Sequence, residues 1–499
     1  MFKRVIYTSI LVLTLVLSTS CNKYLTLYPQ DGITRQEYWQ SKEQIQAAVI
    51  GVYSSLLADP AAKDRQLAEY LFLWGELRAD NVVSSGANIS NDELDMLHNN
   101  ILPTNSIARW SAVYRTINLC NTVLDFAPNV LALDNTLTQD KLNNYVAEAL
   151  TIRSLMYFYL VRTFGDVPLK LKSTSSDTDI QQLPKTKQAD VLAQIVKDLA
   201  TAEQTTAFTY GDKASDKGRI TRYTVYSLEA DVFLWMNNYN DCITACDKII
   251  NSGQFGLVPG DSGFFNALYY KGNSAESIFE FQFDIQALNS FYTMFLQKPR
   301  FFAAANVMDN VFTLDYFDDN NYDHRGRFVS VNANTSQIWK YIGITGDRSF
   351  RSVDQSYAHW IVYRYADILL MKAEAMAYVS RGDESLAIIQ TIRNRANALF
   401  ATRETPSPDD ANGVAQYVID ERDREFAFEG KRWFDLLRFA KRNNYANLGV
   451  LIQASTLNIP GNLQQSASVK LKDVNSLYLP LPFNEVLSDP NLVQNPFYK

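Results

Sequence analysis

Apolar residues recur every three to four positions through most of residues 35–250, which is the period of an α-helix with one buried face. Three examples are RQEYWQSKEQIQAAVIGVYSSLL (35–57), SIARWSAVYRTINLCNTVLDFA (106–127) and AEALTIRSLMYFYLVRTFGDVPL (147–169). In the last of these, Gly165 can adopt the left-handed conformation that ends a helix, and Pro168 blocks any continuation. The periodicity therefore predicts a mainly α-helical protein.

Two later stretches each read as a helix, a short polar turn and a second helix. They are SLEADVFLWMNNYNDCITACDKII (227–250) and LMKAEAMAYVSRGDESLAIIQTIRNRA (370–396), and each has a small residue, Ala230 or Ala373, ahead of the turn. Paired helices of this kind are typical of tetratricopeptide repeats. We therefore expect an array of packed helix pairs.

The pattern changes between residues 251 and 360, where clusters of Gly, Asn and Asp predict irregular structure with few short strands. We expect one body at 35–499. Within it, a helical frame is formed mainly by 35–250 and 361–400, and 401–499 is a C-terminal region. The loop-rich second half at 251–360 is the expected ligand region, because binding residues tend to lie on long loops held by a rigid frame.

The composition limits the classes of partner. The chain has 499 residues, 47% of them hydrophobic, and a formal net charge of −7. It can therefore bury a large core, but it lacks the basic excess that a nucleic-acid backbone requires, so no binding to nucleic acid is expected. Aromatic residues make up 13% of the chain. Rings beyond those a core needs are natural partners of sugars or peptide side chains; the alternative is that they fill helix interfaces.

The N-terminus, MFKRVIYTSILVLTLVLSTSC, has two basic residues before an apolar run and small residues before Cys21. This is the pattern of a secretory signal, and the run is too short to be a stable membrane-spanning helix. A cysteine at the cleavage point is similar to a bacterial lipoprotein signal. We therefore expect a signal peptide at 1–20, lipidation of Cys21, which anchors the protein to a membrane, and a tether at 21–34.

Motifs for metal binding or catalysis are not found. The three histidines, His98, His324 and His359, are scattered and belong to no metal-binding motif. The acidic cluster at 314–328 lacks the ligand spacing of a calcium loop, so no metal or cofactor is expected. A pair of glycosidase carboxylates needs only a suitable separation and no local motif, so that alternative stays open.

The segment DREFAFEGKRWFDLLR (423–438) is dense in charge and could be a carboxylate site, a basic groove or scaffold. Five of its residues are spaced as one face of an α-helix: Phe426, Gly430, Trp433, Phe434 and Leu437. We therefore expect a scaffold helix whose charges lie on a solvated flank, where Glu429 pairs with Arg432 and Asp435 with Arg438. The glycine in the apolar stripe indicates that something approaches its backbone closely.

Four blocks resemble the SusD/RagB family of outer-membrane lipoproteins: 147–169, YRYADILLMKAEA (363–375), 421–438 and YLPLPFNEVLSDPNLVQNPFY (478–498). The resemblance covers essentially the whole mature chain. It implies an α-helical fold in which four tetratricopeptide-like helix pairs pack against an irregular second half, with the charged segment as scaffold.

The resemblance also implies a function in which no bond is broken. Members of the family capture a nutrient, usually a glycan, and deliver it to a TonB-dependent transporter of the SusC type. The expected location is the outer membrane, where the protein is lipid-anchored and faces the cell surface. A minority of the family binds peptides. Two further functions stay open for this sequence, a glycan-degrading enzyme and a plain helical scaffold.

The resemblance points to candidate ligand-binding residues. ELRADN (76–81) looks like the family's acidic turn near the ligand, which makes Asp80 an acceptor for hydroxyl groups with Asn81 beside it. The alternative for Asp80 is that it caps a following helix. Four aromatic residues of the loop-rich region are nominated as stacking surfaces: Tyr292, Phe301, Trp339 and Tyr341. For these the alternative is packing in the core.

Lipidation of Cys21 predicts that the protein is found with membranes and that Cys21→Ala releases it into the soluble fraction. Acyl chains contribute about 0.8 kcal/mol per buried CH₂, and several chains together make a stable anchor. Cell fractionation and metabolic labelling with a fatty acid measure the two properties. A wild-type protein that takes up no fatty acid would contradict this expectation.

Overall fold

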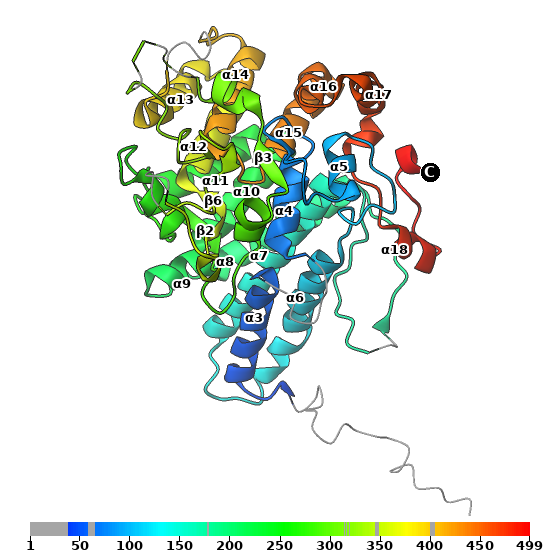
Figure 1. The fold of residues 1–499 in the computed structure, drawn as a ribbon. Helices are drawn as coiled ribbons and strands as arrows, with labels where there is room; N and C mark the ends of the chain where they lie inside the picture. Colours follow the sequence, from blue (N-terminus) through cyan, green and yellow to red (C-terminus); the bar gives the residue numbers. More distant parts are fainter. Residues whose placement is uncertain are drawn as a thin grey trace, which may run out of the picture.

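The structure is a computed structural model and describes residues 38–57, 65–176, 179–313, 315, 317–318, 320–344, 349–399 and 405–499. The expected signal peptide, the lipidation site Cys21 and the tether lie outside these residues. The protein is mainly α-helical, as predicted (Figure 1). The helices of the first half are α3 (Lys42–Leu57), α4 (Leu67–Glu76), α5 (Asn91–Leu97), α6 (Ser111–Val130), α7 (Gln139–Phe164), α8 (Gln188–Thr205), α9 (Lys213–Gly218), α10 (Arg222–Trp235) and α11 (Tyr239–Ile250).

The second half contains short strands and a further set of helices. The helices are α12 (Tyr365–Ala377), α13 (Gly382–Ala396), α14 (Ala411–Phe426), α15 (Arg432–Tyr445), α16 (Leu448–Thr456), α17 (Gly461–Leu471) and α18 (Phe483–Ser488). The strands are β1 (Val82–Ser84), which belongs to the first half, β2 (Ser277–Phe281), β3 (Phe301–Ala303), β4 (Val331–Asn332), β5 (Gln337–Ile338) and β6 (Trp360–Arg364). In the part of the chain that the structure describes, every helix is too short or too polar to span a bilayer.

Most helices pack in pairs. Helix α3 packs against α6, α7 against α8, α10 against α11 and α12 against α13. Contacts of α6 with α7, α8 with α10 and α11 with α12 join the pairs into one array. The pairs predicted from the sequence are α10–α11 and α12–α13. Their small residues Ala230 and Ala373 are both 0% exposed, which lets neighbouring helices approach closely. The predicted array is confirmed.

Helix α7 ends where the sequence predicts. The Thr138 hydroxyl accepts a hydrogen bond from the Lys141 N–H at 3.3 Å and caps the first turn. At the other end, Gly165 has a φ of +77°, which a side chain disfavours, and its N–H donates to the carbonyl of Val161. Pro168 lies three residues beyond, so the helix cannot continue.

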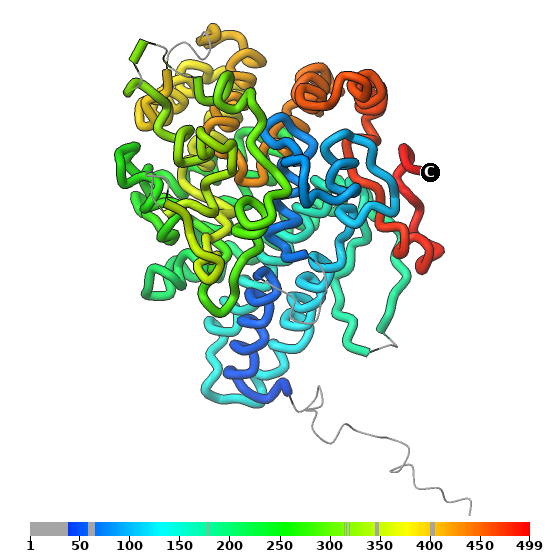
Figure 2. Tube along the Cα trace, viewed as in Figure 1, coloured from blue at the N-terminus to red at the C-terminus, as the bar shows by residue number. Residues whose placement is uncertain are grey.

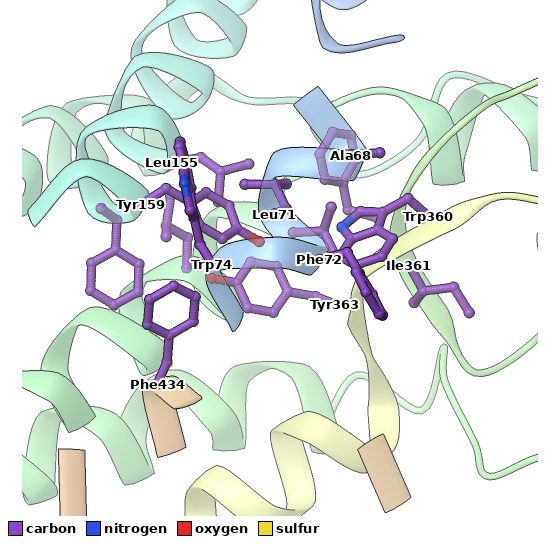
Figure 3. Packing of buried hydrophobic residues seen from close by; sticks show 14 of the residues in the cluster. Ala68, Leu71, Phe72, Trp74, Leu155, Tyr159, Trp360, Ile361, Tyr363 and Phe434 are labelled. Atoms are coloured by element: carbon purple, nitrogen blue, oxygen red, sulfur yellow. The ribbon is translucent and has the colours of Figure 1, made fainter. Parts of the chain in front are cut away.

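Helix α4 lies at the centre of the core, and all ten of its residues are buried. Figure 3 shows its side chains among rings and aliphatic groups from α7, β6 and α15, with Trp74 near Tyr159 and Phe434 and with Phe72 near Trp360. The indole N–H of Trp74 donates to the Ile107 carbonyl at 2.9 Å, so its polar atom is satisfied as well. Helix α4 therefore contacts both the helical array and the irregular half.

Residues 251–360 are irregular, as predicted, and Figure 2 shows their green to yellow-green trace beside the blue α4. The described part of this region contains three π-helical turns: η3 (Asn266–Tyr270), η4 (Thr293–Gln297) and η5 (Val307–Val311). The strands form antiparallel pairs, β2 with β6 and β4 with β5, while β3 pairs with β1. The β1–β3 pair brings the chain that follows α4 against the loop-rich region.

The charged segment is not the single helix that its apolar spacing predicts. Helix α14 ends at Phe426 and α15 begins at Arg432, and between them Gly430 has a φ of +71°, in the left-handed region. The carboxylate of Glu76, in α4, accepts hydrogen bonds from the N–H of Gly430 at 2.7 Å and of Lys431 at 3.3 Å. A partner from a distant helix thus fixes a turn that local spacing does not reveal.

The expected close approach to Gly430 is confirmed. A Cβ atom on Gly75 of α4 would lie 1.9 Å from the Gly430 carbonyl oxygen. A Cβ atom on Gly430 would lie 2.9 Å from the Leu71 carbonyl oxygen and 2.8 Å from the Trp360 ring. The two glycines therefore allow α4 and the turn to touch.

The expected solvated flank is also wrong, because the charges of this segment are buried. The four side chains expected to pair there are 3–8% exposed: Glu429, Arg432, Asp435 and Arg438. Asp435 pairs with Arg438 at 2.9 Å, but Arg438 also binds both carboxylate oxygens of Glu374, in α12, at 2.6 and 2.9 Å. Glu429 and Arg432 take partners from distant segments instead of each other.

Arg364, at the end of β6, is the centre of this buried network and is 0% exposed. Its guanidinium contacts the carboxylates of Glu276 at 2.6 Å, Glu425 of α14 at 2.5 Å and Glu429 of the turn at 3.0 Å. Burial opposes the charge, but Glu429, the Tyr269 phenol and the other two carboxylates raise the pKa of Arg364 well above its ordinary value. These contacts join the irregular half to α14 and the turn.

Gly430→Ala should lower the free energy of unfolding by about 2–5 kcal/mol, because a side chain at positive φ is strained and this Cβ overpacks the core. The matched control is Gly449→Ala in α16, where a Cβ meets nothing within 4 Å. This control should be neutral or stabilising by up to about 1 kcal/mol. Urea unfolding measures both, and wild-type stability in Gly430→Ala would refute the close contact.

Arg438→Ala should cost about 3–5 kcal/mol, because it leaves the Glu374 carboxylate buried without its partner, while Asp435 keeps Arg422 at 2.9 Å. Arg381→Ala removes an exposed pair with Glu384, whose side chains are 40% and 55% exposed, and is the control. It should cost under about 1 kcal/mol. If chemical unfolding gives the two variants the same loss, the buried ion pairs of Arg438 do not stabilise the protein.

Candidate functional site

The fold brings the nominated binding residues into one neighbourhood. Asp80 and Asn81 precede β1, whose antiparallel partner β3 begins at Phe301. The N–H of Ala304 donates to the Asn81 carbonyl at 2.8 Å, and the N–H of Ala303 donates to the Ser336 carbonyl, next to β5, at 2.8 Å. Trp339 and Tyr341 follow β5, and Tyr292 precedes η4, which contacts both β3 and β5.

The polar candidates are engaged with other protein groups. Asp80 is 7% exposed, and its two carboxylate oxygens accept hydrogen bonds from Arg432, each at 2.8 Å. Asn81 is 0% exposed and donates to Asp423 at 2.6 Å. The alternative that Asp80 caps a helix is wrong, because strand β1 follows it. Contact of these side chains with a ligand stays a prediction.

One guanidinium serves two carboxylates here, because Arg432 also lies 3.3 Å from Asp423. Burial and the nearby Asp80 carboxylate raise the pKa of Asp423 to about 7, against the attraction of Arg432. At Asp80 burial is outweighed by Arg432, which lowers the pKa of that carboxyl. A proton-holding acid beside a carboxylate is what a glycosidase uses. These two groups, however, are 7% and 8% exposed and hold protein partners.

Three of the four nominated aromatic residues lie in the core. Phe301 and Trp339 are 0% exposed, and Tyr341 is 4% exposed. The Phe301 ring packs on Phe72 of α4 with centroids 6.1 Å apart, and Tyr341 is stacked on Trp360 at 5.8 Å. These three positions agree with the alternative interpretation, core packing, in which the buried rings support the loops.

Tyr292 differs from the other three because its side chain is partly exposed. Its backbone N–H donates to the Ser356 hydroxyl at 3.2 Å, which holds the start of η4 in place. The next residue, Thr293, is exposed. Tyr292 is thus the nominated ring that a ligand can reach without rearrangement of the core.

An open cavity of about 520 Å³ lies beside α9, the helix labelled at the lower left of Figure 1. We call it the Phe208 cleft. Its walls carry three rings and four charged groups: Phe208, Tyr223, Phe255, Asp212, Lys213, Asp216 and Lys217. Three segments contribute them, namely the chain from α8 through α9, the first turn of α10 and the chain after α11.

A sequence signal for this cleft exists but is partial. The stretch AFTYGDKASDKG (207–218) places aromatic residues in a loop with Gly and Asp, where a core residue is not expected. Nothing in the sequence indicates that Tyr223 and Phe255 join Phe208. Among the described residues, no group of three or more His, Cys, Asp or Glu side chains is arranged to hold a metal ion.

Comparison with known proteins agrees with the fold. Residues 263–498 match the family model for the SusD family, and residues 26–234 match a model described as "Starch-binding associating with outer membrane". The chain is 25% identical over 490 residues to SusD-like protein P38 of Formosa agariphila, covering 88% of this chain and 92% of that protein. It is 24% identical over 530 residues to SusD-like protein P2 of the same organism, covering 97% of each.

Solved structures share the architecture. A SusD superfamily protein from Bacteroides vulgatus superposes with a TM-score of 0.73 at 22% identity, covering 92% of this chain and all (100%) of that one. One from Bacteroides thetaiotaomicron gives 0.72 at 22% identity, covering 92% and 99%. At this identity the likeness concerns the fold. Together with family models that match both halves of the sequence, it leads to one conclusion: the chain belongs to the SusD/RagB family.

Proposed function

We propose that the protein is an outer-membrane, lipid-anchored, cell-surface binding protein that captures an oligosaccharide or polysaccharide and delivers it to a SusC-like TonB-dependent transporter. The observation that carries the proposal is the match of residues 26–234 to the model described as "Starch-binding associating with outer membrane". The match of residues 263–498 to the SusD family supports the same role for the loop-rich half.

The surface around Tyr292 is the proposed place of capture. A sugar ring can stack on a partly exposed tyrosine, because its C–H groups are apolar while its hydroxyls remain in water. Phe301, Trp339 and Tyr341 hold the surrounding loops, and Asp80 and Asn81 fix the adjacent turn through Arg432 and Asp423. Few contacts on an open surface favour an affinity in the micromolar to millimolar range, which also permits release to a transporter.

Binding is favoured over hydrolysis by the position of the carboxylates. The pair whose pKa values resemble those of a glycosidase, Asp423 and Asp80, is buried on Arg432. A sugar would have to break that ion pair to reach them, which costs several kcal/mol. The proposed role is therefore capture without turnover.

Exposed apolar side chains near α18 support docking to a membrane partner. Phe483 and Leu487 of α18 are 48% and 75% exposed, and Leu102 is 56% exposed. The N–H of Phe483 donates to the carbonyl of Pro103 at 3.2 Å, so Leu102 lies next to α18. Grouped apolar residues at a surface are typical of interaction sites. We propose this surface for contact with the transporter.

Calorimetric titration of the soluble protein, truncated after Cys21, against polysaccharides, oligosaccharides and peptides tests the role. At least one glycan should bind, and Tyr292→Ala should weaken it roughly tenfold, which corresponds to about 1.4 kcal/mol. Tyr322→Ala, at a partly exposed tyrosine beside α13, is the control and should bind like the wild type.

Three results would overturn parts of this proposal. Binding of peptides alone would replace the ligand class. Shortening of the bound glycan over time, seen by chromatography of the products, would replace capture by hydrolysis. Unchanged affinity in Tyr292→Ala, with an unchanged melting temperature, would place the capture site elsewhere.

A further inference from the structure

We propose that the Phe208 cleft is a second ligand site and that it takes a sugar unit bearing a carboxylate. The site is distinct from the Tyr292 surface: it lies beside α9, which packs against β2, and Tyr292 is not among its lining residues. This proposal goes beyond glycan capture at Tyr292, because it names a second place of binding and a chemical class of ligand. Both are inferred from the contacts within the cleft.

The cleft has an aromatic wall. The Phe208 and Tyr223 ring centroids lie 5.3 Å apart, and those of Tyr223 and Phe255 lie 5.1 Å apart. Phe208 is 46% exposed, which is unusual for a ring that could pack inside. The cavity of about 520 Å³ is within the range of sites for small molecules. An exposed ring backed by two others suits stacking against the apolar face of a sugar.

Lys217 places a cation at this wall without a counter-ion. Its ammonium lies 4.3 Å from the centroid of the Phe255 ring. Within the described ranges of the chain, it makes no hydrogen bond and no ion pair. Burial lowers the pKa of Lys217 to about 8, against the attraction of Glu280 and Asp216. By contrast, the buried Lys340 pairs with Glu429 at 2.7 Å. A half-buried ammonium gains most from an anion supplied by a ligand.

The acids around Lys217 are already engaged. The Asp212 carboxylate caps α9 by accepting from the Ser215 N–H at 2.9 Å. The Asp216 carboxylate accepts from the Thr209 hydroxyl at 2.8 Å. Glu280 is bound to His359 at 2.7 Å. These carboxylates shape the loop and leave the charge of Lys217 unpaired.

A second cation, Arg222, lies against the Phe208 ring and adds positive charge next to the cleft. The guanidinium carbon of Arg222 lies 4.3 Å from the centroid of the Phe208 ring, and Arg222 donates to the Thr206 carbonyl at 3.0 Å, an uncharged partner. An oligomer of uronic acid can stack on the aromatic wall while one of its carboxylates meets Lys217 beside Phe255, which satisfies both features of the cleft. A neutral sugar satisfies only the first.

The test compares an oligogalacturonate with its methyl ester, which has the same ring but no charge, in titrations of the soluble protein. The acid should bind at least tenfold more tightly than the ester. Lys217→Met keeps the apolar stem and should remove that difference, whereas Lys197→Met, at an exposed lysine of α8, should keep it. Phe208→Ala should weaken both ligands, and Tyr292→Ala should change neither.

A second readout locates the site directly. Bound oligogalacturonate should protect Lys217, but not Lys197, from an amine-reactive reagent, as measured by mass spectrometry. Each of three results would overturn the proposal. The acid and the ester bind equally, Lys217→Met keeps the preference for the acid at an unchanged melting temperature, or the acid shows no saturable binding. Preference for a sulfated galactan oligomer that depends on Lys217 would overturn the assignment of a carboxylate. If oligogalacturonate binding is lost in Tyr292→Ala but kept in Phe208→Ala and Lys217→Met, the acid binds at the Tyr292 surface and the proposal for the cleft is wrong.

Discussion

The contact of the buried Arg364 guanidinium with Glu276, Glu425 and Glu429 is the interaction on which the rest of the structure depends. These charges come from the start of β2, from α14 and from the turn before α15, so one side chain at the end of β6 ties four segments together. Taking such charges out of water is costly, and mutual pairing offsets that cost only while every partner is present. The network therefore holds the irregular half against α14, which in turn packs on α12 of the helical array.

The same network separates scaffold from binding surface. Asp423 and Asp80 resemble catalytic carboxylates in type and in pKa, but both are buried and pair with Arg432. Most nominated rings are used in the same way, as Tyr341 stacks on Trp360 and supports the loops. We propose that the ligand instead meets rings at the surface, the partly exposed Tyr292 and the exposed Phe208. This division fits a protein that captures a ligand and releases it unchanged.

Features that depend on neighbouring residues could be predicted from the sequence. The apolar period located α7 and the α10–α11 and α12–α13 pairs, and Gly165 ended α7 as expected. The segment around Gly430 shows the limit of this reasoning. Its spacing fits a helix, yet Glu76, from α4, holds it as a turn at positive φ. Its charges look solvated, yet Arg438 is buried against Glu374. That partner lies 64 positions earlier in the sequence, so the local pattern does not show it.

The candidate site was harder to predict than the fold. Phe301, Trp339 and Tyr292 were all nominated because they lie in the loop-rich region. Which of these rings is exposed depends on tertiary packing against α4 and β5. The Phe208 cleft was missed because Phe208, Tyr223 and Phe255 are brought together by three segments, and because an unpaired lysine such as Lys217 is visible only when all its neighbours are placed.

We propose that a rigid, internally paired scaffold carries the ligand on surface loops. Hydrogen–deuterium exchange, with and without the best-binding oligosaccharide of the panel, is the decisive measurement. Amide protection should increase in the loops around Tyr292 or Phe208, while residues 421–438 should exchange equally slowly in both states. Ligand-induced change within residues 421–438, with none in those loops, would contradict it.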